Sequence, residues 1–140
     1  MDDCLFCKLA QHQIQSAIIY EDEMIAAILD IHPIAPGHTF IIPKEHFFSV
    51  LDLNQKYFSP LWEGIIKVEK MLTNAFHPDG FTIGINQGRS AGQAIDHLHI
   101  HIIPRFLNDG GKSLHSVVFN PPQENLEEIK NKILKSNNAN

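Results

Sequence analysis

The sequence predicts an α+β fold built on an antiparallel β-sheet. Short runs rich in β-branched and aromatic residues follow one another closely, and a single long segment has helical periodicity. Strands joined by short links pair as antiparallel hairpins, whereas a parallel sheet needs a long crossover, usually a helix, between successive strands. With 140 residues, 44% of them hydrophobic, the chain is long enough to bury one hydrophobic core.

The first half of the chain contains a predicted helical turn and three predicted strands. Two apolar runs are separated by the acidic residues Glu21–Glu23, which predicts a hairpin. Pro33 and Pro36-Gly37 then interrupt the chain before the next apolar run. The predicted elements are a helical turn at Cys4–Gln11 and strands at Ala17–Tyr20, Met24–Leu29 and His38–Pro43.

The segment from Asn54 to Phe76 is the predicted long helix. Apolar residues recur there at roughly helical spacing, and Pro78 follows the end of the segment. Because Pro60 lies near the start, Ser59 is the predicted N-cap of the regular helix. The recurring apolar positions are Phe58, Leu61, Trp62, Ile65, Ile66, Val68 and Leu72.

The second half of the chain adds two predicted strands and a short amphipathic helix. A loop that contains glycines separates the two strands, and a Pro-Pro pair precedes the helix. The polar tail at residues 136–140 is predicted to be frayed, and the whole chain is assigned to a single domain, residues 1–140. The predicted elements are strands at Phe81–Asn86 and His97–Ile103 and a helix at Leu126–Leu134.

Composition and charge argue against several classes of function. The formal net charge of −5 provides no basic field, so no nucleic-acid partner is expected. No apolar run approaches the ~20 residues that span a bilayer, so no membrane association is expected. The N-terminus lacks the basic and apolar regions of a secretory signal, and two closely spaced cysteines do not make a disulfide framework. We therefore expect a cytoplasmic protein.

Residues 97–103, His-Leu-His-Ile-His-Ile-Ile, alternate imidazole and aliphatic side chains. In a strand, His97, His99 and His101 would share one face, and the aliphatic residues would pack into the core from the other. Three imidazoles make a poor core and a costly solvent face for a strand. The run therefore indicates a site for phosphate, metal or acid–base chemistry.

A glycine-containing loop, Gln87–Gln93, lies just upstream of the histidines. Gly88 and Gly92 permit tight turns and let backbone N–H groups approach an anion closely, so the loop is predicted to cradle phosphate. Phosphate chemistry of this kind needs a nucleophile, a proton donor and an orienting group. Imidazoles, with an ordinary pKa near 6.5, can take all three roles at neutral pH.

Several segments together resemble the histidine triad (HIT) family. The run His-Leu-His-Ile-His-Ile-Ile, preceded by Ala-Gly-Gln and followed by Pro-Arg, is similar to the family signature. The resemblance covers about residues 4–105 and leaves residues 106–140 as a C-terminal extension. The matching segments are Cys4–Lys8, Leu29–Ile31, Pro36–Lys44, Ala91–Gln93 and His97–Arg105.

The resemblance implies an enzyme that attacks the α-phosphorus of a purine nucleotide. His99 would be the nucleophile that becomes transiently nucleotidylated, and His101 would contact the phosphate and help to protonate the leaving group. His97 and His38 would orient these histidines by hydrogen bonding. Water would then hydrolyse the intermediate to a nucleoside monophosphate.

The resemblance also implies the residues that bind the nucleotide. Asp30, next to Ile31 in the nucleoside-binding region, would accept hydrogen bonds from the ribose hydroxyls, because a carboxylate acts only as an acceptor. Asn86, Gly92 and Gln93 would hold phosphate oxygens, together with His99 and His101. The family resemblance further implies a homodimer in which the sheets of two chains join. A turn carboxylate that caps the chain before Pro33 is the alternative role for Asp30.

The expected substrate is a purine nucleoside phosphoramidate, such as an AMP or GMP conjugate of an amine. Protonation by a neighbouring imidazolium makes the amine of a P–N bond a good leaving group. Ala94 stands where several phosphoramidases of the family have a serine, and His32 stands where many relatives have a small residue. A dinucleoside polyphosphate is the alternative substrate, and a non-catalytic nucleotide-binding scaffold is the alternative of another class.

Cys4 and Cys7 form half of a zinc site, which on its own is a weak signal. In zinc-bearing HIT proteins, the other half is a histidine after the Pro-Lys turn and the first histidine of the triad. Those positions are His46 and His97 here, and Cys₂His₂ would complete a closed structural zinc site. Two reduced thiols without a metal are one alternative, and a redox Cys-x-x-Cys pair is a weaker one because no thioredoxin-like pattern follows. No organic cofactor is expected.

Overall fold

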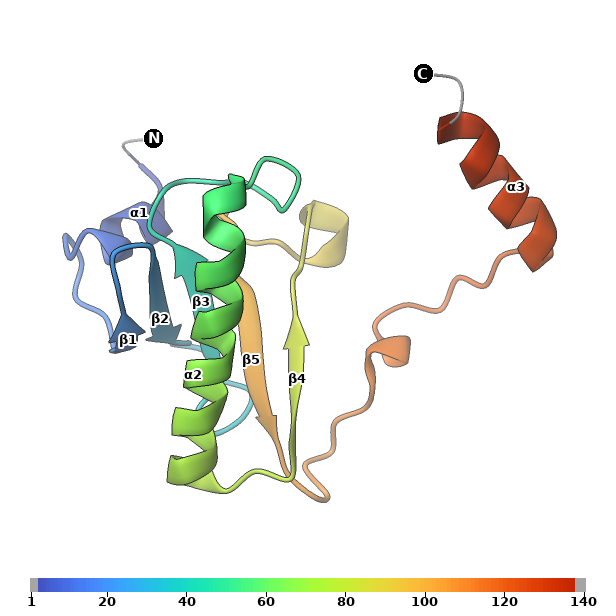
Figure 1. The fold of residues 1–140 in the computed structure, drawn as a ribbon. Helices are drawn as coiled ribbons and strands as arrows, with labels where there is room; N and C mark the ends of the chain where they lie inside the picture. The colour runs from blue at the N-terminus through green and yellow to red at the C-terminus, as the bar shows by residue number, and fades with distance from the viewer. Residues whose placement is uncertain (1–2, 138–140) are drawn as a thin grey trace. The chain divides into compact units, whose positions relative to one another are not determined.

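The computed structural model describes residues 3–137, and within that range the fold is built on a five-stranded antiparallel sheet (Figure 1). The strand order is β1-β2-β3-β5-β4, so β1 and β4 are the edges, and the predicted α+β class is confirmed. The strands are β1 (Ile18–Glu21), β2 (Ile25–Leu29), β3 (Thr39–Pro43), β4 (Gly80–Gly84) and β5 (Ile100–Arg105). The helices are α1 (Leu5–Ala10), α2 (Phe58–Phe76) and α3 (Leu126–Asn137), with 3₁₀ turns at Gln55–Tyr57, Arg89–Ala91 and Leu114–Ser116.

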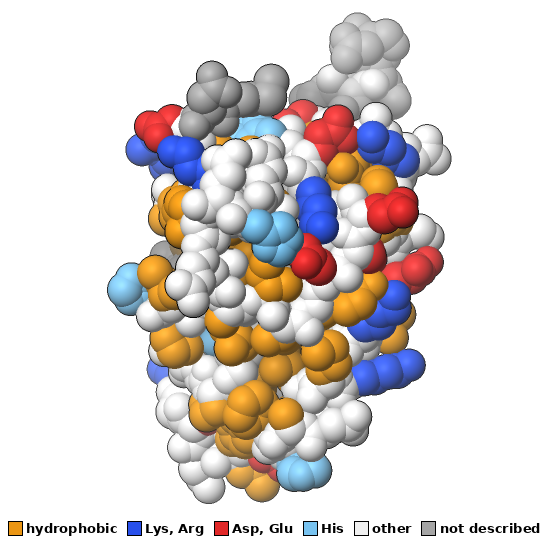
Figure 2. All heavy atoms as spheres, turned by 90° about the vertical axis from the view of Figure 1, so that its left-hand side faces the viewer, with side chains coloured by type: hydrophobic (Ala, Val, Ile, Leu, Met, Phe, Trp, Pro, Cys, Tyr) orange, Lys and Arg blue, Asp and Glu red, His pale blue; other side chains and the backbone are white. Residues whose placement is uncertain are grey.

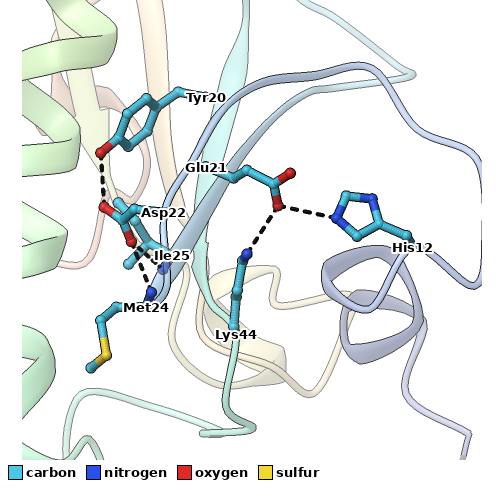
Figure 3. A network of polar contacts seen from close by, with 7 residues as sticks. All are labelled: His12, Tyr20, Glu21, Asp22, Met24, Ile25 and Lys44. Carbon is cyan, nitrogen blue, oxygen red and sulfur yellow. Dashed lines mark hydrogen bonds and ion pairs between the residues drawn. The ribbon is translucent and has the colours of Figure 1, made fainter.

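Polar contacts from its own acidic residues fix the β1–β2 hairpin (Figure 3). The Asp22 carboxylate accepts hydrogen bonds from the backbone N–H groups of Met24 (2.8 Å) and Ile25 (3.0 Å), which satisfies donors at the turn. The Glu21 carboxylate accepts a hydrogen bond from the ammonium group of Lys44, just after β3, at 2.9 Å. The acidic residues that predicted the hairpin therefore also hold it to the neighbouring strand.

Helix α2 covers one face of the sheet (Figure 1). Its apolar stripe packs on the aliphatic side chains of β2, β3 and β5. Gly64 allows a close approach, because a Cβ at this position would collide with the side chain of Ile25. The buried core on this face comprises Ile25, Ala27, Ile41, Phe47, Tyr57, Leu61, Ile65, Val68, Leu72, Leu98, Ile100 and Ile102.

The opposite face of the sheet carries a second hydrophobic cluster, against which α1 packs. Phe6 of α1 stacks on Phe40 of β3, with 4.8 Å between the ring centroids. The rings of His97 and His99 lie edge-on to Phe6, at 5.9 Å and 5.1 Å, and both histidines are buried. The expectation that the histidine face would make a poor core is therefore wrong for these two residues, because aromatic rings enclose them.

The start of α2 differs from the prediction. The helix begins at Phe58 with Tyr57 in the N-cap position, so Ser59 is not the N-cap. The polar cap lies further upstream, where the Asn54 side chain accepts a hydrogen bond from the backbone N–H of Lys56 (3.1 Å) at the head of a 3₁₀ turn. The 3₁₀ turn leads directly into the helix, so the polar capping residue stands before the turn and not immediately before the helix. A prediction from residue type alone therefore placed the cap at Ser59.

Strand β5 begins at Ile100, three residues later than predicted. The backbone N–H of Leu98 donates to the carbonyl of Phe47 at 2.6 Å, so this part of the histidine run is bonded to the loop after β3. His101 lies in the strand, opposite Phe40 of β3, whereas His97 and His99 precede it. The histidine run is therefore part loop and part strand.

Contacts between residues divide the chain into two compact units, one ending at Asp109 and the other beginning at Gly110. The second unit contains α3, which runs to Asn137 rather than ending at Leu134 as predicted. Asn125 and Glu128 cap α3 reciprocally: the Glu128 backbone N–H donates to the Asn125 side chain (3.0 Å), and the Asn125 N–H donates to the Glu128 carboxylate (2.9 Å).

The surface carries charges of both signs. Figure 2 shows Lys and Arg side chains interspersed with Asp and Glu mainly in the upper half of one face, and hydrophobic side chains gathered toward its lower half. The potential over this face is therefore mixed in sign rather than basic. Between residues 3 and 137, no helix combines the length and the apolar character that crossing a membrane requires.

Candidate active site and metal centre

The four histidines that the sequence assigns to catalysis lie close together beside the middle of the sheet. His38 directly precedes β3, His101 lies in β5, and His97 and His99 precede β5. The ring centroids of His99 and His101 are 5.0 Å apart, and those of His38 and His101 are 5.2 Å apart. The structure thus brings together side chains from two segments that are more than fifty residues apart in the sequence.

A single hydrogen bond defines the protonation of the His99 ring. Nδ1 of His99 lies 2.8 Å from the backbone carbonyl oxygen of His97. Because a carbonyl oxygen can only accept, Nδ1 must carry the proton and donate it to this bond. The Nε2 atom of a neutral His99 is then unprotonated and has a lone pair available for attack on an electrophile.

A chain of hydrogen bonds orders His38 and His101 in the same way. The backbone N–H of Ile34 donates to Nδ1 of His38 at 3.3 Å, so the proton of a neutral His38 is on Nε2. Nε2 of His38 lies 3.0 Å from Nδ1 of His101 and 3.6 Å from the Asp30 carboxylate. A neutral His101 accepts at Nδ1 and keeps its own proton on Nε2, where it can donate to a substrate atom.

Burial makes these donors neutral in the free protein. Burial, together with the neighbouring His99 and His38, lowers the pKa of His101 to about 4, although the Asp30 carboxylate opposes the shift. Burial also lowers the pKa of His38, again opposed by Asp30. At neutral pH the two imidazoles therefore form an uncharged hydrogen-bonded pair, with the Asp30 carboxylate 3.6 Å from Nε2 of His38.

An open cleft of 490 Å³ lies beside this chain, along the β2–β3 connection. Asp30 lines the cleft, and its carboxylate also accepts a hydrogen bond from the backbone N–H of His32 (2.8 Å), which fixes the turn. Ile31 is 83% exposed. The Asp30 carboxylate therefore orders the turn, which is the alternative role considered for it, and the residue also lines the cleft. The cleft is lined by Leu29, Asp30, Pro33, Ile34, Ala35, Pro36, Gly37 and His38.

The glycine-containing loop is braced by the side chain of Gln93. Gln93 is buried: its carbonyl oxygen accepts from the backbone N–H of Gly88 (2.7 Å), and its amide N–H₂ donates to the carbonyls of Phe48 (2.9 Å) and Ile95 (3.2 Å). Gly88 and Gly92 have φ values of +83° and +90°, which non-glycine residues rarely adopt. The structure thus assigns the Gln93 amide to shaping the loop.

Asn86 and Gly92 lie next to each other in this loop, and both are exposed. A Cβ built on Gly92 would lie 3.8 Å from the amide nitrogen of Asn86, in ordinary van der Waals contact. The strand before the loop, β4, ends at Gly84, two residues before the predicted end at Asn86. Asn86 therefore belongs to the loop, where its amide faces the same space as the Gly92 backbone.

Cys4, Cys7, His46 and His97 form a compact group at the start of α1. Nδ1 of His97 lies 3.4 Å from the Cys4 sulfur and 3.5 Å from the Cys7 sulfur, and Nδ1 of His46 lies 3.4 Å from the Cys7 sulfur. The ligand atoms of all four residues lie within 4.8 Å of one another. The four residues predicted to bind a metal are therefore brought together.

The chemistry of this group fits a zinc ion. Tetrahedral Cys₂His₂ coordination with ordinary Zn–S and Zn–N lengths places each sulfur about 3.5 Å from each nitrogen, which matches the observed separations. Nε2 of His97 lies 2.9 Å from the carbonyl of Pro43, so Nε2 carries the proton and Nδ1 offers its lone pair to the sulfur side. Burial and the Cys4 thiol raise the pKa of Cys7 to about 11, which disfavours the thiolate. A bound cation would favour the thiolate and so offset this effect.

Two contacts of the site were not predicted from the sequence. The carbonyl of Pro43 and the backbone N–H of Ile34 fix the tautomers of His97 and His38, and both are backbone groups whose residue type gives no signal. The contact of Phe6 with His99 was not predicted either, although the sequence places Phe6 between the two cysteines of the predicted metal site.

Comparisons with known proteins agree on one family. The HIT domain matches residues 11–108. An uncharacterised HIT-like protein of Borreliella burgdorferi is 43% identical over 116 residues, which are 79% of this chain and 81% of that protein. The crystal structure of a HIT family member from Bacillus subtilis is 34% identical, with a TM-score of 0.81 over 95% of this chain and 96% of its own. A zinc-bound histidine triad family protein from Mycobacterium smegmatis is 26% identical, with a TM-score of 0.70 over 99% of both chains.

Two relatives are named as hydrolases. The adenylylsulfatase HINT3 of Arabidopsis thaliana is 36% identical over 104 residues, which are 74% of this chain and 53% of that protein. The bis(5'-adenosyl)-triphosphatase of Dictyostelium discoideum is 37% identical over 91 residues, which are 65% of this chain and 61% of that protein. The family therefore includes hydrolases, and the domain match, the relatives and the shared fold show that this chain belongs to the histidine triad (HIT) family.

Proposed function

We propose that this protein hydrolyses purine nucleotide conjugates at the α-phosphate through a covalent nucleotidyl-histidine intermediate. The observation that carries the proposal is the fixed tautomer of His99, whose Nδ1–H donates to the His97 carbonyl at 2.8 Å and leaves Nε2 as a nucleophile. His101, with a proton on Nε2, lies beside it. Group transfer needs a nucleophile next to a proton donor, whereas a protein that only binds a nucleotide needs neither.

The reaction would proceed in two steps. In the first, Nε2 of His99 attacks the α-phosphorus, the bond from phosphorus to the amine breaks, and His101 donates a proton to the departing nitrogen. The negative charge of the bound phosphate raises the pKa of His101, so this buried imidazole takes up a second proton from solvent and donates the proton on Nε2 to the leaving nitrogen. In the second step water attacks phosphorus, the bond to His99 breaks, and the proton of the water passes to His101.

The cleft and the loop would bind the nucleotide. Asp30 would accept hydrogen bonds from the ribose hydroxyls, and the exposed Ile31 would contact the nucleoside. Asn86 and the Gly92 backbone would donate to phosphate oxygens, and the loop conformation that brings them there depends on the buried Gln93. His38 would hold the His101 ring through the 3.0 Å hydrogen bond.

A panel of substrates tests the proposal. We expect the protein to release AMP from adenosine phosphoramidate and to cleave AMP–amine conjugates faster than diadenosine triphosphate, because an amine protonated by His101 leaves readily. The bis(5'-adenosyl)-triphosphatase among the relatives makes dinucleoside polyphosphate hydrolysis the second candidate, and faster turnover of diadenosine triphosphate would establish it instead. Tight binding of AMP without turnover of any conjugate would contradict both and favour a nucleotide-binding scaffold.

A structural zinc ion at Cys4, Cys7, His46 and His97 is part of the proposal. The support is the fit of the four ligand atoms to tetrahedral coordination and the zinc-bound relative from Mycobacterium smegmatis. A zinc ion here would tie the start of α1 to the segments after β3 and before β5. A reducing compartment such as the cytoplasm would keep both cysteines available as ligands.

We also propose that two chains form a homodimer through the β4 edge and α2. Strand β4 pairs only with β5, which leaves its other side open among the described residues. An apolar groove of 480 Å³ runs beside it, and two of its aromatic residues, Phe58 and Trp62, are half or more exposed. Pairing of two β4 edges would join the sheets and cover this groove.

Trp62, 65% exposed, provides the test of the dimer. We expect Trp62→Glu to shift the protein from dimer to monomer in analytical ultracentrifugation, because a charge would be buried at the centre of an apolar interface. Met71→Glu is the matched control, since Met71 is an exposed apolar residue of the same helix outside the groove. A monomeric native protein, or a Trp62→Glu variant that remains dimeric, would contradict this interface.

A further inference from the structure

Phe6 forms a bridge between the metal centre and the catalytic histidines. Its ring lies edge-on to the His99 ring, with 5.1 Å between centroids and an interplanar angle of 79°, and it stacks on Phe40 on the other side at 4.8 Å. Phe40 also meets His99 edge-on, at 6.3 Å. Phe6 and His99 are each only 6% exposed. Two aromatic rings therefore enclose the imidazole that we assign as the nucleophile.

The orientation of the His99 ring determines whether it can act. Rotation of an imidazole by 180° about its last side-chain bond exchanges Nδ1 with a carbon and moves Nε2 to the opposite edge. One hydrogen bond, from Nδ1–H to the His97 carbonyl, opposes this rotation. A single bond of this kind contributes modestly, so packing against the ring decides how completely the reactive orientation is populated.

The position of Phe6 is in turn set by its neighbours at the start of α1, the N-cap residue Cys4 and the helical residue Cys7. Cys4 and Cys7, on either side of Phe6, both contact Nδ1 of His97. The carbonyl of the same His97 accepts the hydrogen bond from His99. The residues that anchor α1 therefore reach His99 by two routes, through the His97 backbone and through the Phe6 ring.

We propose that Phe6 is a positioning residue for His99: its ring holds the imidazole with Nδ1 on the His97 carbonyl and Nε2 toward the substrate. The proposal rests on the proposed function for the catalytic role of His99, whereas the placement of the ring stands on the packing alone. Loss of the Phe6 ring would lower the rate of the chemical step rather than the affinity for the nucleotide, because Phe6 packs against His99 and is not among the residues that line the cleft.

Three variants of the full-length, zinc-loaded protein test this role. Phe6→Leu keeps an apolar side chain and removes the ring, and Phe6→Tyr keeps the ring. Leu9→Ala is the matched control, because Leu9 belongs to the same helix and the same buried cluster. We expect Phe6→Leu to lower kcat about 10-fold with KM changed less than about twofold, while Phe6→Tyr and Leu9→Ala stay within about threefold of the native kcat.

Long-range proton–nitrogen NMR of the imidazole rings supplies a readout that needs no substrate. The native protein and Leu9→Ala should show His99 with a protonated Nδ1 and a bare Nε2, and Phe6→Leu should show this signature weakened or averaged, with the zinc content unchanged. An unchanged His99 signature and native kcat in Phe6→Leu would overturn the proposal, as would equal losses in Phe6→Leu and Leu9→Ala. If the native protein cleaved no nucleotide conjugate, the proposed function would fail, while the spectrum would still decide the role of Phe6.

Discussion

Replacing His99 by alanine is expected to abolish the release of AMP from adenosine phosphoramidate, with a loss of kcat/KM of at least about a thousandfold. An enzyme that loses its nucleophile keeps only what binding and electrostatics contribute. The side chain is also irreplaceable locally, because His101 has its Nδ1 occupied by the hydrogen bond from His38 and its Nε2 protonated. The measurement is the rate of AMP release under saturating and limiting substrate.

A control must show that the loss of activity in His99→Ala comes from the missing nucleophile and not from a disturbed fold or binding site. We expect His99→Ala to bind AMP within about tenfold of the native protein in calorimetry, since Asp30 and the loop at Asn86 and Gly92 remain in place. Rapid quenching of the native enzyme should trap a protein whose mass is higher by one nucleotidyl group, and the variant should not form it. His115→Ala, a histidine of the C-terminal unit, serves as the control that keeps full activity. Native turnover in His99→Ala would refute the assignment of the nucleophile.

The secondary structure could be predicted where local chemistry decides it. The hairpin of β1 and β2 follows from acidic turn residues between two apolar runs, and α2 ends at Phe76 as its periodicity and Pro78 indicate. The start of β5 could not be predicted, because it depends on a hydrogen bond from the backbone N–H of Leu98 to the carbonyl of Phe47, a residue far away in the sequence. Boundaries that depend on a distant partner have no local signal.

The α2 pattern shows a second kind of limit. Periodicity identified the apolar positions of the helix correctly, but it did not separate the core from the exposed surface. Leu61, Ile65 and Val68 are buried against the sheet, whereas Phe58 and Trp62 are at least half exposed. The apolar stripe of α2 is wider than its contact with the sheet, and only the tertiary structure separates the side chains that pack on the sheet from those that line the exposed groove.

The site residues could be predicted by type and spacing, but the state of each could not. His99 and His101 stand where the motif requires them, yet their tautomers depend on the His97 carbonyl and on a relay from His38. Gln93 shows the same limit, because a polar residue in a glycine-containing loop indicates a ligand contact, whereas the fold commits its amide to the loop itself. The hydrogen-bond partners of a histidine or glutamine side chain are set by the tertiary structure, and these partners determine which of its atoms donates and which accepts.

Removing zinc from the native protein is expected to lower its melting temperature by roughly 10–15 °C. A ligand that binds only the folded state at a thousand times its Kd stabilises that state by about 4 kcal/mol, and for a domain of this size each kcal/mol corresponds to a shift of several degrees. The effect should be large because the group joins α1, the segment at His46 and the segment at His97, which are far apart in the sequence. Differential scanning calorimetry with and without a chelator measures it, alongside elemental analysis of one zinc per chain.

The variant Cys7→Ala separates the metal from the packing of a buried thiol. Truncating Cys7 removes one sulfur from a buried site, so some loss of stability is expected even without metal. The distinguishing quantity is the difference between zinc-loaded and chelated protein, which should be large in the native chain and near zero in Cys7→Ala. His46→Ala should behave like Cys7→Ala, whereas His12→Ala, which removes an exposed histidine paired with Glu21, should keep the full zinc-dependent shift. A chelator can lower the melting temperature only by removing an ion that the folded state binds. If the melting temperature of the native protein were the same with and without zinc, the four residues would therefore form a thiol–imidazole cluster without a metal.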